Sequence, residues 1–240
     1  MKLIKTSLLF GAILTTPAWA EGTFTLGAFT SNDASVYSDH DDWSLVPYVA
    51  YDTEHFHVGF DGVAYHLMNT EQTTLSVGAS TNYGDIFDQD IAFFDGLDRE
   101  ADLQIELTVD HDFGGFFVEG EVAVDVSVAK SGHFATVAAG YATDLSFASL
   151  SVKGGVTYTS EEHNQYYYGV TTDEVTAGRS VYLADDAFLP FIAVEALVPV
   201  SDNVTFVAQV EFIDLEDVKD SPLLDADTNA TALLGIAYQF

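Results

Sequence analysis

Seven acidic residues lie where they could act together: Asp102, Glu106, Glu119, Glu121, Asp125, Glu195 and Glu211. Each falls in a run of alternating polar and apolar residues, as where Leu103, Ile105 and Leu107 alternate with Gln104 and Glu106. Gathered together, such carboxylates could bind cations or serve as acid and base in catalysis. Alternation equally predicts that they line the wet interior of a small β-barrel, since alternate side chains of a strand point to opposite faces. The sequence favours this second interpretation.

The histidines give a weaker pattern. His55 and His57 are two residues apart on an expected strand and so share a face, with His66 nearby. The remaining histidines are scattered over expected turns and loops. Because a zinc site needs three or four ligands in a fixed geometry, we do not expect a metal here.

Three acidic loops are rich in oxygen ligands, at Asp39–Asp42, Asp85–Asp90 and Asp214–Asp227. Weak calcium or magnesium binding is an option, but none has the spacing of an EF-hand, so solvated surface is the favoured interpretation. The chain has no cysteine, and we find no nucleophile elbow and no glycine-rich phosphate loop. The sequence therefore predicts no enzyme and no cofactor.

The amino-acid composition limits the classes of partner that this chain can bind. The formal net charge is −31, which excludes nucleic acid as a partner. Nearly half of the residues are hydrophobic, which argues against a disordered chain. Lys2 and Lys5 precede an apolar run that ends in Ala18-Trp19-Ala20, so Met1–Ala20 reads as a secretory signal peptide and residues 21–240 as one mature domain. No later stretch approaches the roughly 18 apolar residues of a membrane helix.

The elements that must position these residues are strands. The closing run Thr231–Phe240 places Leu234, Ile236, Tyr238 and Phe240 on one face and small or polar residues on the other. An apolar outer row with an aromatic residue at the water boundary is typical of a membrane-spanning barrel. A terminal Phe240 with Tyr238 two residues before it also resembles the signal that the bacterial barrel-assembly machinery reads.

Alternation predicts an all-β fold: a single antiparallel transmembrane barrel in the outer membrane of a Gram-negative bacterium, in contact with its lipid. Eleven runs are found, at Thr23–Ser31, Ser44–Asp52, Phe56–Asn69, Thr73–Asn82, Asp102–Asp110, Val118–Ser127, His133–Thr143, Ser146–Thr159, Phe188–Val200, Asn203–Ile213 and Thr231–Phe240. An even number is expected when both ends lie in the periplasm. Asp61-Gly62 interrupts one run and could be a bulge or a very short turn. A turn there would split the run and make twelve strands, which we prefer, whereas one false strand would make ten.

Two features do not follow simple alternation. Pro47 lies inside an expected strand, and because proline cannot donate to a sheet ladder we expect it at a bulge or near a strand end. Ser160–Asp185 is the longest non-alternating segment, and we expect it, with Asp33–Asp42 and Tyr83–Arg99, to be an outer loop. Its aromatic run Tyr166-Tyr167-Tyr168 could be a membrane girdle, a loop anchor or a binding platform, and the first two are favoured.

Several segments resemble the MipA/OmpV family of outer-membrane proteins. The most specific are Tyr167-Tyr168-Gly169-Val170 and Asp220-Ser221-Pro222, with support from Leu45–Tyr51, Phe94–Asp98 and Gly235–Phe240. Together they cover nearly the whole chain after residue 20. The acidity and the scarcity of arginine depart from the family pattern.

The resemblance implies an outer-membrane barrel that acts as a scaffold linking a lytic murein transglycosylase to a peptidoglycan synthase. Other branches of the family are linked with porin-like permeability, adhesion or stress response. From the residues alone, the alternative is a small cation-preferring pore lined by the lumen acids.

Overall fold

The computed structural model describes residues 22–32, 37, 43–82, 93–97, 99–100, 102–127 and 131–240. The expected signal peptide Met1–Ala20, the loop Asp33–Asp42 except Tyr37, and most of the expected loop Tyr83–Arg99 lie outside the described residues. The strands are β1 (Thr23–Asn32), β2 (Trp43–Asp52), β3 (Phe56–Gly59), β4 (Gly62–Asn69), β5 (Thr73–Asn82), β6 (Asp102–Asp112), β7 (Phe116–Asp125), β8 (His133–Asp144), β9 (Ser149–Thr159), β10 (Ala187–Pro199), β11 (Val204–Asp214) and β12 (Thr228–Gln239).

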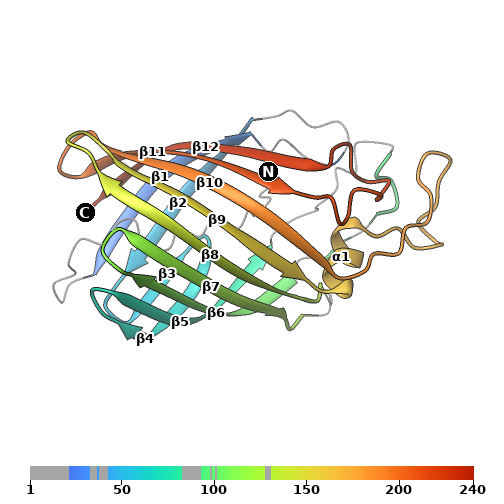
Figure 1. The fold of residues 1–240 in the computed structure, drawn as a ribbon, viewed down its shortest axis with the longest axis horizontal. Coiled ribbons are helices and arrows are strands. Elements are labelled where there is room, and N and C mark those ends of the chain that lie inside the picture. Colours follow the sequence, from blue (N-terminus) through green and yellow to red (C-terminus); the bar gives the residue numbers. More distant parts are fainter. Residues whose placement is uncertain are drawn as a thin grey trace.

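These strands form one closed antiparallel barrel (Figure 1). Each strand pairs with the next in the chain, and β12 returns to pair with β1 from Thr25↔Gln239 to Asn32↔Ala232. The predicted fold class and the preferred number of twelve strands are confirmed. Among the described residues no helix is long and apolar enough to cross a membrane.

The twelfth strand arises where the sequence showed a break. Gly59 pairs with Gly62 across a turn of two residues, Phe60 and Asp61, so the run 56–69 folds back on itself as β3 and β4. Gly62 has φ +141°, a conformation that side-chain-bearing residues rarely adopt. A second irregularity follows in β4, where the register with β5 shifts between His66 and Met68.

The alternation between apolar outward-facing and lumen-facing side chains holds around the barrel. Large apolar side chains such as Ile105 on β6, Ile192 on β10 and Ile236 on β12 are 43%, 51% and 49% exposed, because they belong to the outer face. Their neighbours in the chain face the lumen and are buried or half-buried. The outer face is therefore apolar, as lipid requires.

Three phenylalanine rings on the lumen side occupy space that glycines leave on neighbouring strands. A Cβ at Gly235 would lie 2.1 Å from the Phe29 ring, one at Gly140 would lie 2.4 Å from Phe117, and one at Gly155 would lie 2.7 Å from Phe191. Because glycine has no side chain, the rings can approach the barrel wall closely at these three positions. This close packing explains the glycines at positions 140, 155 and 235.

The connections differ between the two ends of the barrel. We call the turn end the one with residues 53–55, 70–72, 113–115, 145–148 and 200–203, together with the last residue, Phe240. The other end, the loop end, holds residues 160–186 and 215–227 and the helix α1 (Glu161–Tyr168), to the right in Figure 1. Leu145 N–H donates to the Ala148 carbonyl at 2.7 Å, so β9 begins at Ser149 rather than at Ser146.

The helix α1 was not predicted, since its segment was expected to be a loop. Ser160 is its N-cap and accepts from the His163 amide, and Glu161 and Glu162 occupy its first turn. Such a cap and such charges stabilise a helix start. Eight largely polar residues are too few to show a helical period, which is why the pattern missed it.

The prediction for Pro47 was wrong, because it lies at neither a bulge nor a strand end. It is the fifth residue of β2 and pairs with Ala28 of β1 in regular register. On the other side of β2, pairing with β3 covers only Ala50 to Asp52. Pro47 therefore sits on a stretch of β2 that no described strand pairs on that side, where a missing N–H costs no ladder bond.

Candidate functional site: a lid over an acidic lumen

All seven acids singled out in the sequence lie on lumen-facing positions of their strands. Their apolar neighbours in the chain are exposed on the outer face, whereas the acids are buried or half-buried. The seven acids occupy different levels of the lumen, and only some of them come together. They are Asp102, Glu106, Glu119, Glu121, Asp125, Glu195 and Glu211.

The central group forms around one cation. Lys153 on β9 reaches across β8 to β7, where its Nζ lies 2.8 Å from Glu119 Oε2. Lys153 also interacts electrostatically with Asp110, Glu195 and Glu211. Four carboxylates thus lie within electrostatic range of one ammonium group, which forms an ion pair with Glu119, and this excess of negative charge attracts further cations. Asp110 was not among the acids singled out, although its alternation with Val109 was a usable signal.

The other acids have local partners. Glu106 accepts a hydrogen bond from the Ser80 hydroxyl. Asp125 Oδ1 accepts from the Ser127 amide at 2.7 Å and its Oδ2 from the Ser131 amide at 2.5 Å. Asp125 therefore organises the connection after β7.

Asp102 is the acid nearest the lid. Its Oδ2 accepts from Gln104 Nε2 at 2.8 Å, Ser131 Oγ at 2.7 Å and the Tyr167 hydroxyl at 3.3 Å. With 2% of its surface exposed, this carboxylate needs such donors to compensate its desolvation. It ties β6 to α1.

The histidines do not gather as the sequence suggested. His55 lies in the exposed turn before β3, so it does not share a strand face with His57. His57 Nδ1 lies 2.6 Å from Asp52 Oδ1, and its Nε2 lies 2.8 Å from Asp61 Oδ1. His66 instead bonds Ser76 Oγ at 2.8 Å. Both ring nitrogens of His57 are occupied, and the described part of the chain holds no group of three or more potential metal ligands.

The loop end is covered by a packed lid. We use this name for α1, residues 93–97, 99–100, 169–186 and 215–227, and Tyr37. Its apolar core is made of Tyr37, Phe94, Leu97, Val170 and Leu223, with Phe93, Tyr168, Tyr182 and Leu224 packed against it. Because burial removes the phenol oxygen from water, the pKa of Tyr168 is raised to about 12.

The lid spans the mouth of the barrel. Tyr37 follows β1 and donates from its hydroxyl to the Tyr167 carbonyl at 3.1 Å. Tyr167 in turn contacts Asp102 of β6, and the neighbouring His163 ring packs on Phe134 of β8. The strands β6 and β8 flank β7, which stands opposite β1 in the twelve-stranded ring. The contacts therefore cross the opening of the barrel. Burial lowers the pKa of His163 to about 4.

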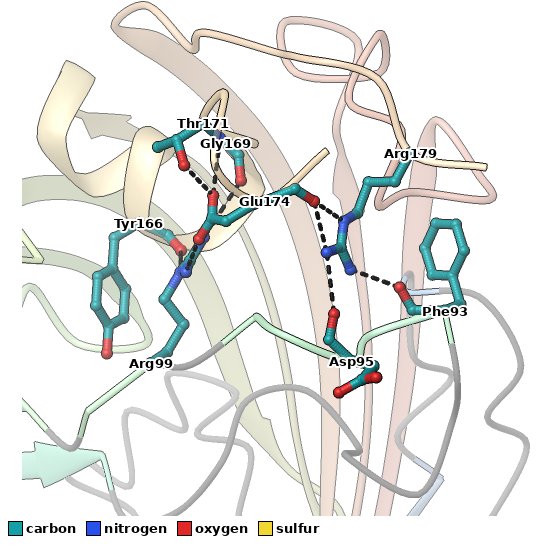
Figure 2. Close-up of polar contacts among 8 residues, drawn as sticks. All are labelled: Phe93, Asp95, Arg99, Tyr166, Gly169, Thr171, Glu174 and Arg179. Atoms are coloured by element: carbon teal, nitrogen blue, oxygen red, sulfur yellow. Dashed lines mark hydrogen bonds and ion pairs between the residues drawn. The ribbon is translucent and has the colours of Figure 1, made fainter. Parts of the chain in front are cut away.

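Two arginines hold the lid from within (Figure 2). The guanidinium of Arg179, 1% exposed, donates to the carbonyls of Phe93 at 2.5 Å, Asp95 at 3.1 Å and Glu174 at 2.6 and 2.8 Å. Arg99 donates to Glu174 Oε1 at 2.5 Å. Although burial opposes it, bonds from Arg99 and Thr171 hold the pKa of Glu174 below its usual range.

Arg99 also binds the end of α1. It donates to the carbonyls of Tyr166 at 2.8 Å and Gly169 at 3.3 Å. The sequence interpretation missed both arginines. The available signal was that they are the only two in a chain with 38 acids, and that both fall in expected loops.

Residues 25–240 of the sequence match the model of the family described as MltA-interacting protein MipA. The chain belongs to this family. The predicted resemblance to MipA/OmpV proteins is confirmed.

Relatives of this chain include outer membrane protein OmpV of Vibrio cholerae, with 27% identity over 219 residues, which cover 90% of this chain and 85% of the relative. The MltA-interacting protein of Escherichia coli K12 is 28% identical over 244 residues, covering 97% and 98%. Among solved structures, LpxR from Salmonella typhimurium superposes with a TM-score of 0.48 at 14% identity, over 90% of this chain and all of that one. The predicted location in the outer membrane of a Gram-negative bacterium agrees with the names of the relatives and with the barrel.

The two segments that carry the resemblance most specifically, 167–170 and 220–222, meet in the lid. Ser221 Oγ donates to the Tyr168 carbonyl at 2.6 Å and accepts from the Leu223 amide at 3.2 Å. Val170 and Leu223 are fully buried. Gly169 closes α1 with its N–H bonded to the Gln165 carbonyl. Tyr167, Tyr168, Gly169, Val170, Asp220, Ser221 and Pro222 thus belong to one packed structure, and Tyr166–Tyr168 lie on the lid helix.

The last residues close the barrel at the turn end. Tyr238 lies on the outer face of β12, and its ring stacks edge-on with Phe240 at 4.6 Å. The Phe240 amide donates to the Phe24 carbonyl at 3.0 Å. These residues are accessible, with Phe240 67% exposed.

Proposed function

We propose that this chain is a non-enzymatic outer-membrane scaffold that holds a murein transglycosylase, and with it a peptidoglycan synthase, at its turn end in the periplasm. The observation that carries the proposal is the match to the MipA family over 216 residues, 25–240, including a relative named MltA-interacting protein. The lid supports it, because a covered mouth favours a structural role over free diffusion through the lumen.

The surface offered to such a partner is acidic with apolar tips. Each of the five turns has an acid within it or at its edge: Glu54, Glu71, Asp112, Asp144 and Asp202. Phe113 and Phe147 in the turns are 60% and 66% exposed, and no lysine or arginine lies in the five turns. A basic partner face with apolar contacts fits this surface, and its binding should weaken as salt screens the charges.

The direct test is site-specific photo-cross-linking in intact cells. A photo-reactive residue at Phe147 should capture a murein hydrolase or synthase. The same residue at Leu183, which is 72% exposed at the loop end, is the matched control and should not. If every turn position captures only barrel-assembly components, the scaffold proposal fails.

Charge can be tested separately. The triple variant E54Q/E71Q/D202N removes three turn acids that form no side-chain bond holding a turn together among the described residues. It should reduce capture at Phe147 while the amount of barrel stays constant. Unchanged capture would mean that the acids take no part in the contact.

A second candidate function is a cation-preferring path through the lumen, favoured by the four carboxylates around Lys153. Under this hypothesis planar-bilayer recordings give cation-selective openings that shrink in the double variant E106Q/E121Q. A variant with a loosened lid, R179M, should open more often. Absence of openings in both proteins would exclude this path.

A further inference from the structure

The β8–β9 hairpin extends farther from the barrel than the β6–β7 turn beside it, at the left of Figure 1. β8 pairs with β7 only as far as Tyr141, and the Ala142 amide then donates to the Gly115 carbonyl at 2.7 Å. The following residues of β8 pair only with β9. We call residues 143–148 the arm. Residues 141–147 are all exposed, on the lumen side as well as on the outer side, so the arm projects beyond the barrel wall.

The arm is held by its own bonds and has an aromatic tip. The Leu145 amide donates to the Ala148 carbonyl at 2.7 Å, and the Ser149 hydroxyl donates to Asp144 Oδ1 at 2.5 Å. Phe147 in this turn is 66% exposed. An apolar side chain that is already fixed in place but uncovered loses little conformational entropy when a partner covers it. Such aromatic side chains are enriched at protein interfaces.

The other exposed phenylalanine of the turns, Phe113, has a different environment. Its ring packs on His111 at 4.3 Å and on Phe116 at 5.9 Å. Phe116 and the paired Tyr141 are outward-facing and 48% and 55% exposed. Outward-facing aromatic residues near strand ends form the belt that barrels place at the membrane–water boundary. Phe113 is therefore held against this belt.

Phe147 lies beyond the belt. Asp144, the last residue of β8, is three residues past Tyr141, which corresponds to about 10 Å along the strand. At the usual tilt of barrel strands this is about 7–8 Å along the barrel axis. The ring of Phe147 is therefore surrounded by water rather than by lipid, and covering it would be favourable through the hydrophobic effect.

The charge of the turn end determines which kind of molecule can cover the ring. Each of the five turns has an acid in it or at its edge, and none has a lysine or arginine. A second copy of this chain would bring the same acidic surface, and like charges across an interface oppose association. A protein with a basic surface is complementary to it.

We propose that the arm is the docking element of the turn end, and that Phe147 inserts into an apolar pocket, rimmed by basic groups, on the periplasmic protein that the barrel holds. This inference rests on the scaffold function proposed above and adds its anchoring residue. Asp144 at the base of the arm, and Asp202 in the adjacent β10–β11 turn, face the basic rim. Phe147 is the hot spot of the contact, because one buried aromatic ring can carry much of the binding energy of an interface.

Photo-cross-linking in intact cells tests the anchor. A photo-reactive residue at Thr143, which is exposed on the arm, should capture a murein hydrolase or synthase. F147A should lower this yield at least about tenfold, as expected for the loss of a hot spot, and F147W should restore most of it. F113A should lower the yield less than F147A does. L183A is the matched control, because Leu183 is 72% exposed at the loop end, and its yield should equal that of the parent chain.

The outcomes separate the anchor from the scaffold function. Capture that F147A leaves unchanged, or that F113A lowers equally, would overturn the anchor while the scaffold function stands. Capture of a second copy of this barrel in place of a murein enzyme would also overturn it. If no turn position captures a murein enzyme, the scaffold function fails and the anchor fails with it. Heat-modifiable migration verifies that each variant folds.

Tryptophan fluorescence in bilayers of brominated phospholipid checks the position of the ring without any partner. Trp43 is the only tryptophan after residue 20, so W43F gives a clean background for F147W. V194W is the lipid-exposed reference, since Val194 is 50% exposed on the outer face. F147W should be quenched several-fold less than V194W, and less than F113W. Quenching of F147W as strong as that of V194W would place the ring in lipid and overturn the docking role.

Discussion

Replacing Arg179 by methionine should loosen the lid without unfolding the barrel. The variant R179M keeps most of the side chain's volume but removes four hydrogen bonds to three carbonyls, those of Phe93, Asp95 and Glu174. The residues that carry these carbonyls are half-buried or exposed, and an acceptor that loses its donor costs about 1–3 kcal/mol when it is buried. Taking the low end for each, the free energy of lid opening should fall by about 3 kcal/mol, which corresponds to roughly 100-fold more open lid.

Limited proteolysis measures this opening, because cleavage tracks the open population when opening is fast compared with cutting. Cleavage between residues 170 and 185 should accelerate by about two orders of magnitude, while heat-modifiable migration of the barrel is retained. The control is K219M, since the Lys219–Glu216 pair is exposed and such pairs contribute little. Cleavage of R179M at the rate of the parent chain would refute the role given to Arg179.

Three further predictions concern the lid and the barrel closure. Because burial lowers the pKa of His163 from 6.5 to about 4, the unfolded lid binds more protons between these values. Lid stability, measured by proteolysis, should therefore fall from pH 6.5 to about 4, with a flatter profile over this range for H163Q. At still lower pH, protonation of Glu174, whose pKa is held low in the folded lid, should weaken the lid further in both proteins. L223A should cost about 2–5 kcal/mol of lid stability, because Leu223 is fully buried and its truncation leaves a cavity. Faster hydrogen exchange of residues 215–227 would measure this loss, and unchanged exchange would mean that the lid core is loosely packed. Deleting Phe240 should lower the barrel in outer-membrane fractions far more than deleting Asp202, and equal amounts would show that the last residue is not read in assembly.

Local patterns determined most of the barrel. A strand's two faces meet lipid and lumen directly, so alternation along β6 and β7 was sufficient to place Glu106, Glu119 and Glu121 inside. The break at Asp61-Gly62 likewise indicated a very short turn or a bulge from residue types alone, and the structure has the turn. Each of these features depends on neighbours in the chain, and the sequence contains that information.

Only the tertiary structure decided how distant segments meet. Ser221 and Tyr168 are 53 residues apart but share a hydrogen bond, and Lys153 selects Glu119 across an intervening strand. No periodicity encodes which loop crosses the mouth or which acid a lysine reaches, because these depend on the closure of the ring and its register. Pro47 shows the same division: its type forbids a ladder bond, but only the short β3–β4 hairpin beside it explains why none is needed.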